Sequence, residues 1–191
     1  MKGMLSMLGV LALPVVAQTV NAVEHLQRTE RMFLEETAGL SEAQWKFKPG
    51  PDRWSVAECA EHITASEEML YGLAAKVSKG PVAAEGSKVP DAKVVAGVTD
   101  RSFKAQAPEA LRPVARWANR EEVAKEFQAR RARTLALAAP PAEAELRKRV
   151  APNQVFGTLD AYQWILFLSG HAERHVMQMR EVKASPDFPK Q

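Results

Sequence analysis

Cysteine is almost absent from this 191-residue chain, which contains only Cys59. A single cysteine excludes an internal disulfide, a thiolate-cluster metal site and any paired-cysteine redox motif. Aromatic residues are also scarce, at 7% of the chain, whereas alanine is abundant, and this combination favours helices over sheets. The remaining composition, 46% apolar and 26% charged, is ordinary for one globular domain.

An excess of one charge is also missing. The chain has 26 basic and 23 acidic residues, a formal net charge of +3, and the two signs are interleaved along most of its length. Nucleic-acid-binding proteins concentrate basic residues on one face. The densest basic stretch here, Arg130, Arg131 and Arg133, is interpreted as one solvated side of a helix. The sequence therefore predicts no nucleic-acid partner.

The only long apolar run stands at the N-terminus. A basic Met-Lys start precedes the run from Gly3 to Val16, and small residues stand before the polar Gln18. This pattern is typical of a secretory signal peptide over residues 1–17, with a second candidate cut after Ala22. The run is shorter than the roughly 20 residues that span a bilayer. We therefore expect a periplasmic or secreted protein without stable membrane insertion.

Helical periodicity dominates the chain after this segment. Four long helices are expected at 19–40, from the capping box at Ser55 to about Val77, from the Asn119 cap to just before Pro140, and from about Thr158 to Lys183. No strand pattern is convincing. The sequence predicts an all-α fold, a four-helix bundle with a long crossover loop at residues 78–118, between the second and third helices.

Three of the four histidines point to metal chemistry. His171 and His175 are separated by one helical turn, so both side chains leave the same apolar face. His62 stands on the second helix, in an inner row with Cys59, Ser66 and Met69. Bundle metal sites are built from side chains on facing helices, and three nitrogen ligands leave a coordination position open. The alternative is three core histidines that bind backbone carbonyls or water.

The residues around these histidines have structural interpretations of their own. Cys59 is interpreted as a small buried residue and not as a fourth ligand. Trp54 is expected to staple the preceding loop to the helix, with pocket lining as the alternative. His25 is interpreted as a surface histidine, and Glu67 and Glu68 as solvent-exposed.

The neighbours of the histidine pair complete the candidate site. One of Glu173, Arg174 and Gln178 could orient a ligand, with solvent exposure expected for Glu173. A general acid or base near Asp100 and Arg101 would favour an enzyme, whereas purely apolar pocket walls would favour a binding protein. No serine or cysteine nucleophile with a paired base is evident.

The order of several short motifs resembles the DinB-like superfamily of helical bundles. The motifs that carry the resemblance are Leu40-Ser-Glu-Ala-Gln-Trp45, Pro51-Asp-Arg-Trp-Ser-Val-Ala-Glu-Cys-Ala-Glu-His62, Gly157-Thr-Leu-Asp-Ala-Tyr-Gln-Trp164 and His171-Ala-Glu-Arg-His175-Val-Met-Gln178. The resemblance implies one DinB-like bundle domain over residues 20–188.

In that family a metal is held by one histidine of the second helix and two of the fourth. The resemblance therefore implies that His62, His171 and His175 bind a divalent ion, with nickel, zinc, iron and manganese all represented among family members. Such an ion supports hydrolysis or group transfer on a small-molecule substrate. The alternative is a bundle that binds a metal or small ligand without catalysis. A homodimer is compatible with either function.

Overall fold

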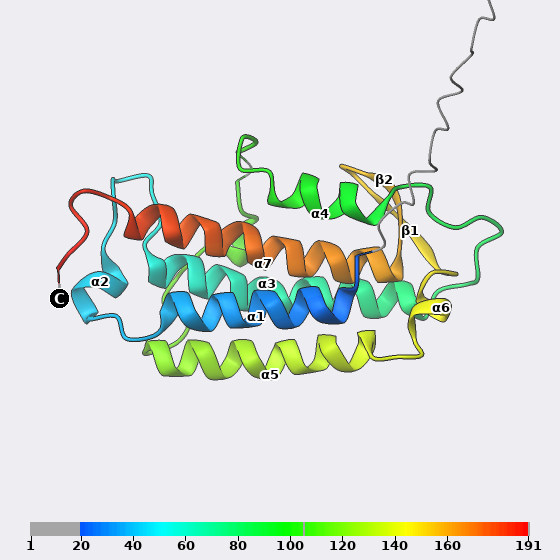
Figure 1. The fold of residues 1–191 in the computed structure, drawn as a ribbon, viewed down its shortest axis with the longest axis horizontal. Helices are drawn as coiled ribbons and strands as arrows, with labels where there is room; N and C mark the ends of the chain where they lie inside the picture. The colour runs from blue at the N-terminus through cyan, green and yellow to red at the C-terminus, as the bar shows by residue number, and fades with distance from the viewer. Residues whose placement is uncertain (1–19, 105, 191) are drawn as a thin grey trace, which may run out of the picture.

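Four long helices lie side by side and form the body of the molecule (Figure 1). The computed structural model describes residues 20–104 and 106–190, so the predicted signal segment 1–17 lies outside the described residues. The long helices are α1 (Ala22–Thr37), α3 (Val56–Ser78), α5 (Arg120–Ala138) and α7 (Ala161–Lys183). The colours in Figure 1 show that α1 and α7 run in one direction and that α3 and α5 run in the opposite one. The chain is mostly helical, as predicted.

Side-chain caps fix where these helices begin. Asn21 accepts a hydrogen bond from a first-turn amide of α1, and Asn119 does the same for α5. The predicted box at the start of α3 is confirmed, because Ser55 and Glu58 each accept the other's backbone N–H, at 3.1 and 2.8 Å. These contacts satisfy amides that have no partner within the helix. The cap at Ser55 therefore fixes the residue at which α3 begins.

The expected start of the last helix at Thr158 is wrong, and so is the absence of strands. Residues 157–160 form β2 (Gly157–Asp160), which pairs antiparallel with β1 (Val150–Asn153). The helix α7 begins only after Asp160, which forms a reciprocal capping box with Gln163. Asp160 therefore caps the first turn of α7. The backbone of residues 157–160 pairs with β1 in the hairpin and does not extend the helix.

The segment between α3 and α5 is the long connection predicted from the sequence, and two short helices interrupt it. It contains α4 (Asp91–Thr99) and the 3-10 helix η1 (Glu109–Leu111). The helix α4 packs along α7, as Figure 1 shows, and buries Val94 and Val98 in the core. Two further short helices are α2 (Glu42–Lys46) and α6 (Glu143–Leu146). No helix in the described part of the chain is long and apolar enough to cross a membrane.

The hydrophobic core consists of two clusters along the bundle. On α7, Leu168 belongs to the first cluster and Ala172 to the second, so His171 stands between them. On α3, Glu67 stands in the same way between Leu70 of the first cluster and Ile63 of the second. Polar residues, among them Glu67 and His171, thus form a layer between the two apolar clusters.

Two charged residues of this layer correct the sequence interpretation. Arg131 and Glu67 were expected in solvent, but the two side chains are 0% and 2% exposed and form a two-point ion pair at 2.5 and 3.1 Å. Arg131 also donates to the Leu26 carbonyl and to Thr29 Oγ1, at 2.7 and 2.6 Å. The pair can be buried because every one of these charged atoms has a partner. Glu68, by contrast, is half-exposed as expected.

Candidate metal centre

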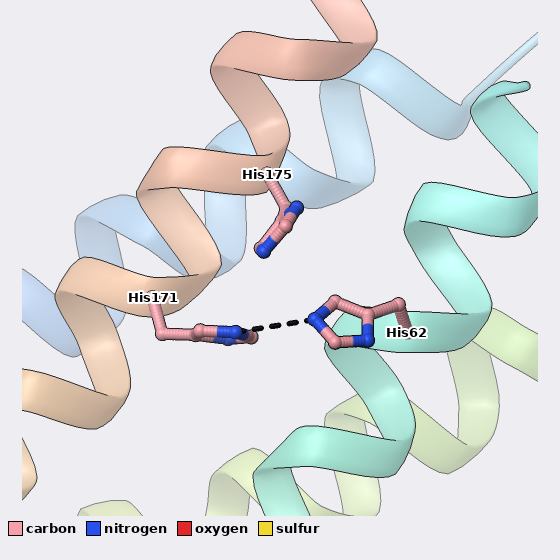
Figure 2. A group of neighbouring side chains, drawn as sticks. All are labelled: His62, His171 and His175. Atoms are coloured by element: carbon pink, nitrogen blue, oxygen red, sulfur yellow. Dashed lines mark hydrogen bonds between the residues drawn. The ribbon is translucent and has the colours of Figure 1, made fainter. Parts of the chain in front are cut away.

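His62, His171 and His175 converge between α3 and α7. Figure 2 shows His171 and His175 extending from successive turns of α7 toward His62 on α3. One ring nitrogen of each histidine lies within 4.8 Å of the others, and the Nε2 atoms of His62 and His171 are 3.2 Å apart. In the described part of the chain, these three residues alone make up the converging group of potential ligands. The structure therefore brings together all three histidines singled out in the sequence.

Hydrogen bonds fix the rings of two histidines. Nδ1–H of His62 donates to the backbone carbonyl of Leu111 in η1, at 2.9 Å. Nδ1–H of His175 donates to Gln178 Oε1, also at 2.9 Å. Since a carbonyl oxygen only accepts, Nδ1 carries the proton in both rings. The lone pairs of these rings are therefore on Nε2, the nitrogen available to a metal.

Burial keeps the three imidazoles neutral. It lowers the pKa of His171 to about 3, helped by the neighbouring His62 and Arg174. The pKa of His175 lies well below its ordinary value for the same main reason, with the other two histidines adding to the effect. Burial also lowers the pKa of His62, partly offset by its bond to Leu111. The neutral form is the one that ligates a metal.

Trp54 covers one side of the cluster. Its ring centroid lies 4.8 Å from that of His62 and 5.9 Å from that of His175. The tryptophan also packs against the second core cluster, as expected of a residue that staples the loop to α3. Cys59 is fully buried in that cluster and burial raises its thiol pKa. Trp54 therefore lines the site, whereas Cys59 packs as a hydrophobic residue.

A polar chain extends from His175 toward the loop after α4. Gln178 Oε1 accepts from His175 and, at 3.4 Å, from Arg101. Arg101 is held by two hydrogen bonds to Glu181, at 2.8 and 3.0 Å. Of the three residues considered for orienting a ligand, Gln178 is the one with a hydrogen bond to a histidine of the cluster, whereas Glu173 contacts His25. Arg174 instead donates to backbone carbonyls at the end of α4 and in the following loop.

A family model described as the DinB superfamily matches residues 25–179, most of the chain and all three histidines. This chain belongs to the DinB superfamily. The resemblance found in the sequence motifs is thus confirmed.

Two Bacillus subtilis proteins are similar to this DinB superfamily member. YuaE of strain 168 is 30% identical over 148 residues, which cover 78% of this chain and 88% of YuaE. The solved structure of YfiT matches with a TM-score of 0.58 at 12% identity, covering 85% of this chain and 83% of YfiT. YfiT is described as "a probable metal-dependent hydrolase with an unusual four-helix bundle topology". The likeness to YfiT supports the bundle architecture predicted from the sequence.

His25 is not the surface residue expected from the sequence of this DinB superfamily member. Its side chain is 6% exposed, and Nδ1 lies 2.7 Å from Ser169 Oγ. Arg28 contacts His25 Nε2 and also binds Glu173 at two points, at 2.8 and 2.9 Å. Glu173 is therefore engaged between α1 and α7, although exposure was expected. Ser169 and Glu173, which His25 contacts on α7, are distant from it in sequence, so the local pattern on α1 gave no sign of these contacts.

The Leu111 carbonyl is the functional group that sequence reasoning missed. It orients His62 through a main-chain oxygen, and such a contact does not depend on the type of side chain. The prolines and glycines of the surrounding segment predict irregular structure but not which carbonyl faces α3.

Proposed function

We propose that this DinB superfamily protein binds one divalent metal ion through His62, His171 and His175 and catalyses hydrolysis or group transfer on a small-molecule substrate. We further propose that it acts in the periplasm or outside the cell. Nickel, zinc, iron and manganese are the candidate ions, because imidazole nitrogen suits all of these.

The convergence of three neutral imidazoles carries the proposal. Their Nε2 atoms include a pair 3.2 Å apart. Two nitrogens on one tetrahedral zinc ion, with bonds of about 2.0–2.1 Å, lie roughly 3.3 Å from each other. Partner atoms hold the opposite nitrogen of two rings, as in many metal sites. The donor set therefore fits a divalent ion.

Three protein ligands leave a position for water or substrate, which is the arrangement of catalytic sites. When bound there, a divalent ion would supply Lewis-acid chemistry toward a carbonyl or phosphoryl oxygen and would lower the pKa of a water molecule. The chain's own residues orient and shield the site. Leu111 and Gln178 fix two of the ligating rings, and Trp54 excludes water from one side.

A metal-binding protein without catalysis is the second candidate. The observation in its favour is the absence, within residues 20–104 and 106–190, of a carboxylate in the converging group. Asp100 and Arg101, the residues considered for acid–base work, bind Ser102 and Glu181. If the protein were an enzyme, the general acid or base of its reaction would have to come from the substrate or from water.

Metal content provides the direct test. Protein purified without an affinity tag should contain about one divalent ion per chain, since three neutral nitrogen ligands make a strong site. The His171→Ala variant should contain far less, because two nitrogens remain. Elemental analysis of both proteins measures the difference, and equal, sub-stoichiometric metal in the two would contradict the site.

The same two proteins separate the enzyme from the binding protein. Wild type loaded with each candidate ion should hydrolyse at least one member of a panel of amide, ester and phosphoester substrates, and His171→Ala should not. Full metal loading with no turnover on any substrate, including transfer to small nucleophiles, would favour the non-catalytic alternative.

If the protein is exported, its signal peptide should be cleaved from the mature chain. Mass spectrometry of the protein from its native host should find a chain beginning at Gln18, or at Val23 for the later cut. The fold supports the earlier cut, because Asn21 caps α1 and the Ala22 amide donates to the Tyr162 hydroxyl at 2.8 Å. Intact protein beginning at Met1 in the soluble cytoplasm would contradict export.

A further inference from the structure

A buried carboxylate lies next to His62 in the sequence and holds the segment that contacts this histidine. The side chain of Glu61, 8% exposed, accepts the backbone amides of Val114 and Ala115, each at 2.8 Å. It also accepts a hydrogen bond from the Arg116 guanidinium at 2.5 Å. One carboxylate thus binds three consecutive residues that follow η1.

Arg116 extends this contact back toward the histidine. Its guanidinium donates to the carbonyls of Ala110 and Arg112, at 2.7 and 2.8 Å. These two carbonyls flank Leu111, whose own carbonyl accepts Nδ1–H of His62 at 2.9 Å. The Glu61 carboxylate and the Arg116 guanidinium therefore hold the backbone on both sides of the group that orients the ring.

The backbone of this segment has to be held in place. Ala115 adopts a φ of 58°, a left-handed conformation that residues other than glycine adopt where surrounding contacts impose it. The amide of Ala115 is one of the groups bound by Glu61. Without the carboxylate, relaxation of Ala115 would move the segment and with it the Leu111 carbonyl.

We infer that Glu61 is a positioning residue for the metal site, acting through residues 110–116 to hold the Leu111 carbonyl against His62 Nδ1. This inference rests on the proposed metal site. Adjacent residues on a helix point in different directions, so Glu61 itself does not enter the site. Its function is to fix the tautomer and the orientation of His62, so that Nε2 faces the other two histidines.

Titration of the metal-free protein with Zn²⁺ and Co²⁺ tests this function. Loss of a group that orients a ligating histidine typically weakens metal affinity about 10- to 100-fold, and this is the expected rise in Kd for Glu61→Ala. The visible absorption of bound Co²⁺ should change as well, because it reports coordination geometry. Glu61→Gln keeps one acceptor oxygen and should fall between wild type and Glu61→Ala on both measurements.

Glu68→Ala is the matched control. Glu68 stands on the same helix and carries the same charge, but it pairs with Arg133 at the surface. This variant should keep the wild-type Kd and Co²⁺ spectrum. If Glu61→Ala does not fold, as checked by circular dichroism, Glu61→Gln and Arg116→Gln give the answer instead.

The outcomes separate the two proposals. Wild-type affinity and spectrum in the Glu61 variants, or in the folded substitutes, would overturn the positioning function while leaving the metal site intact. Failure of the wild-type protein to bind either ion would overturn the proposed metal site, and the inference with it.

Discussion

Replacing His171 by alanine is expected to abolish the stabilisation of the protein by metal. A ligand that binds only the folded state stabilises it by about 2.7 kcal/mol when its free concentration is a hundred times its Kd. For a chain of this size the gain corresponds to a rise in Tm of roughly 5–10 °C. Thermal melts with and without nickel, zinc or manganese should show this rise in wild type. They should show little or none in His62→Ala, His171→Ala or His175→Ala.

His25→Ala is the control for these melts. This fourth histidine is buried on α1 and binds Ser169 and Arg28. Its replacement should lower the Tm of the metal-free protein while leaving the metal-induced rise unchanged. The control thus separates loss of a histidine from loss of a ligand. If metal raised the Tm of wild type and of His171→Ala equally, the proposed site would be contradicted. The three histidines would then be interpreted as buried for packing alone.

The convergence of the three histidines was predictable only in part from local information. The spacing of His171 and His175 places both on one helix face. That His62 faces this pair was implied by the resemblance of the motifs to the DinB-like superfamily. The capping residues Ser55 and Asn119 fix the helix starts in the same local way.

The rest of the fold depends on contacts that no local pattern contains. The hairpin was missed because its strands have four residues each and β1 includes Pro152, which is depleted in strands. The ion pair of Glu67 and Arg131 joins residues 64 positions apart. In the sequence of a single helix, a charged residue indicates the side that faces solvent. Only the position of an oppositely charged residue on a facing helix shows that the charge is buried instead.

Replacing one partner of the Glu67–Arg131 ion pair should strongly destabilise the protein. Glu67→Leu leaves a buried guanidinium that cannot lose its proton, and the expected cost is about 3–5 kcal/mol. That loss corresponds to a fall in Tm of roughly 6–20 °C. Thermal and chemical unfolding monitored by circular dichroism measure it.

Arg131→Met should cost less than Glu67→Leu, because a carboxyl group can become neutral. Burial already raises the pKa of Glu67 with Arg131 in place, and removal of the guanidinium raises the pKa further. In the folded variant the Glu67 carboxyl then stays protonated at pH values above ~4.3, where the same carboxyl in the unfolded chain, with its ordinary pKa, is ionised. Its stability relative to wild type should therefore increase as the pH is lowered from about 7 toward 5, and decrease as the pH rises.

The double variant Glu67→Leu/Arg131→Met should recover most of the stability lost in Glu67→Leu. It removes both charges together, and Thr29 Oγ1 still donates to the Leu26 carbonyl at 3.1 Å. The pair of Glu68 and Arg133 is the matched control, because it joins the same two helices at 2.7 Å but is about half-exposed. Glu68→Leu should cost about 0–1 kcal/mol. Equal losses from Glu67→Leu and Glu68→Leu would contradict the argument, because only the first variant leaves an unpaired charge inside the bundle.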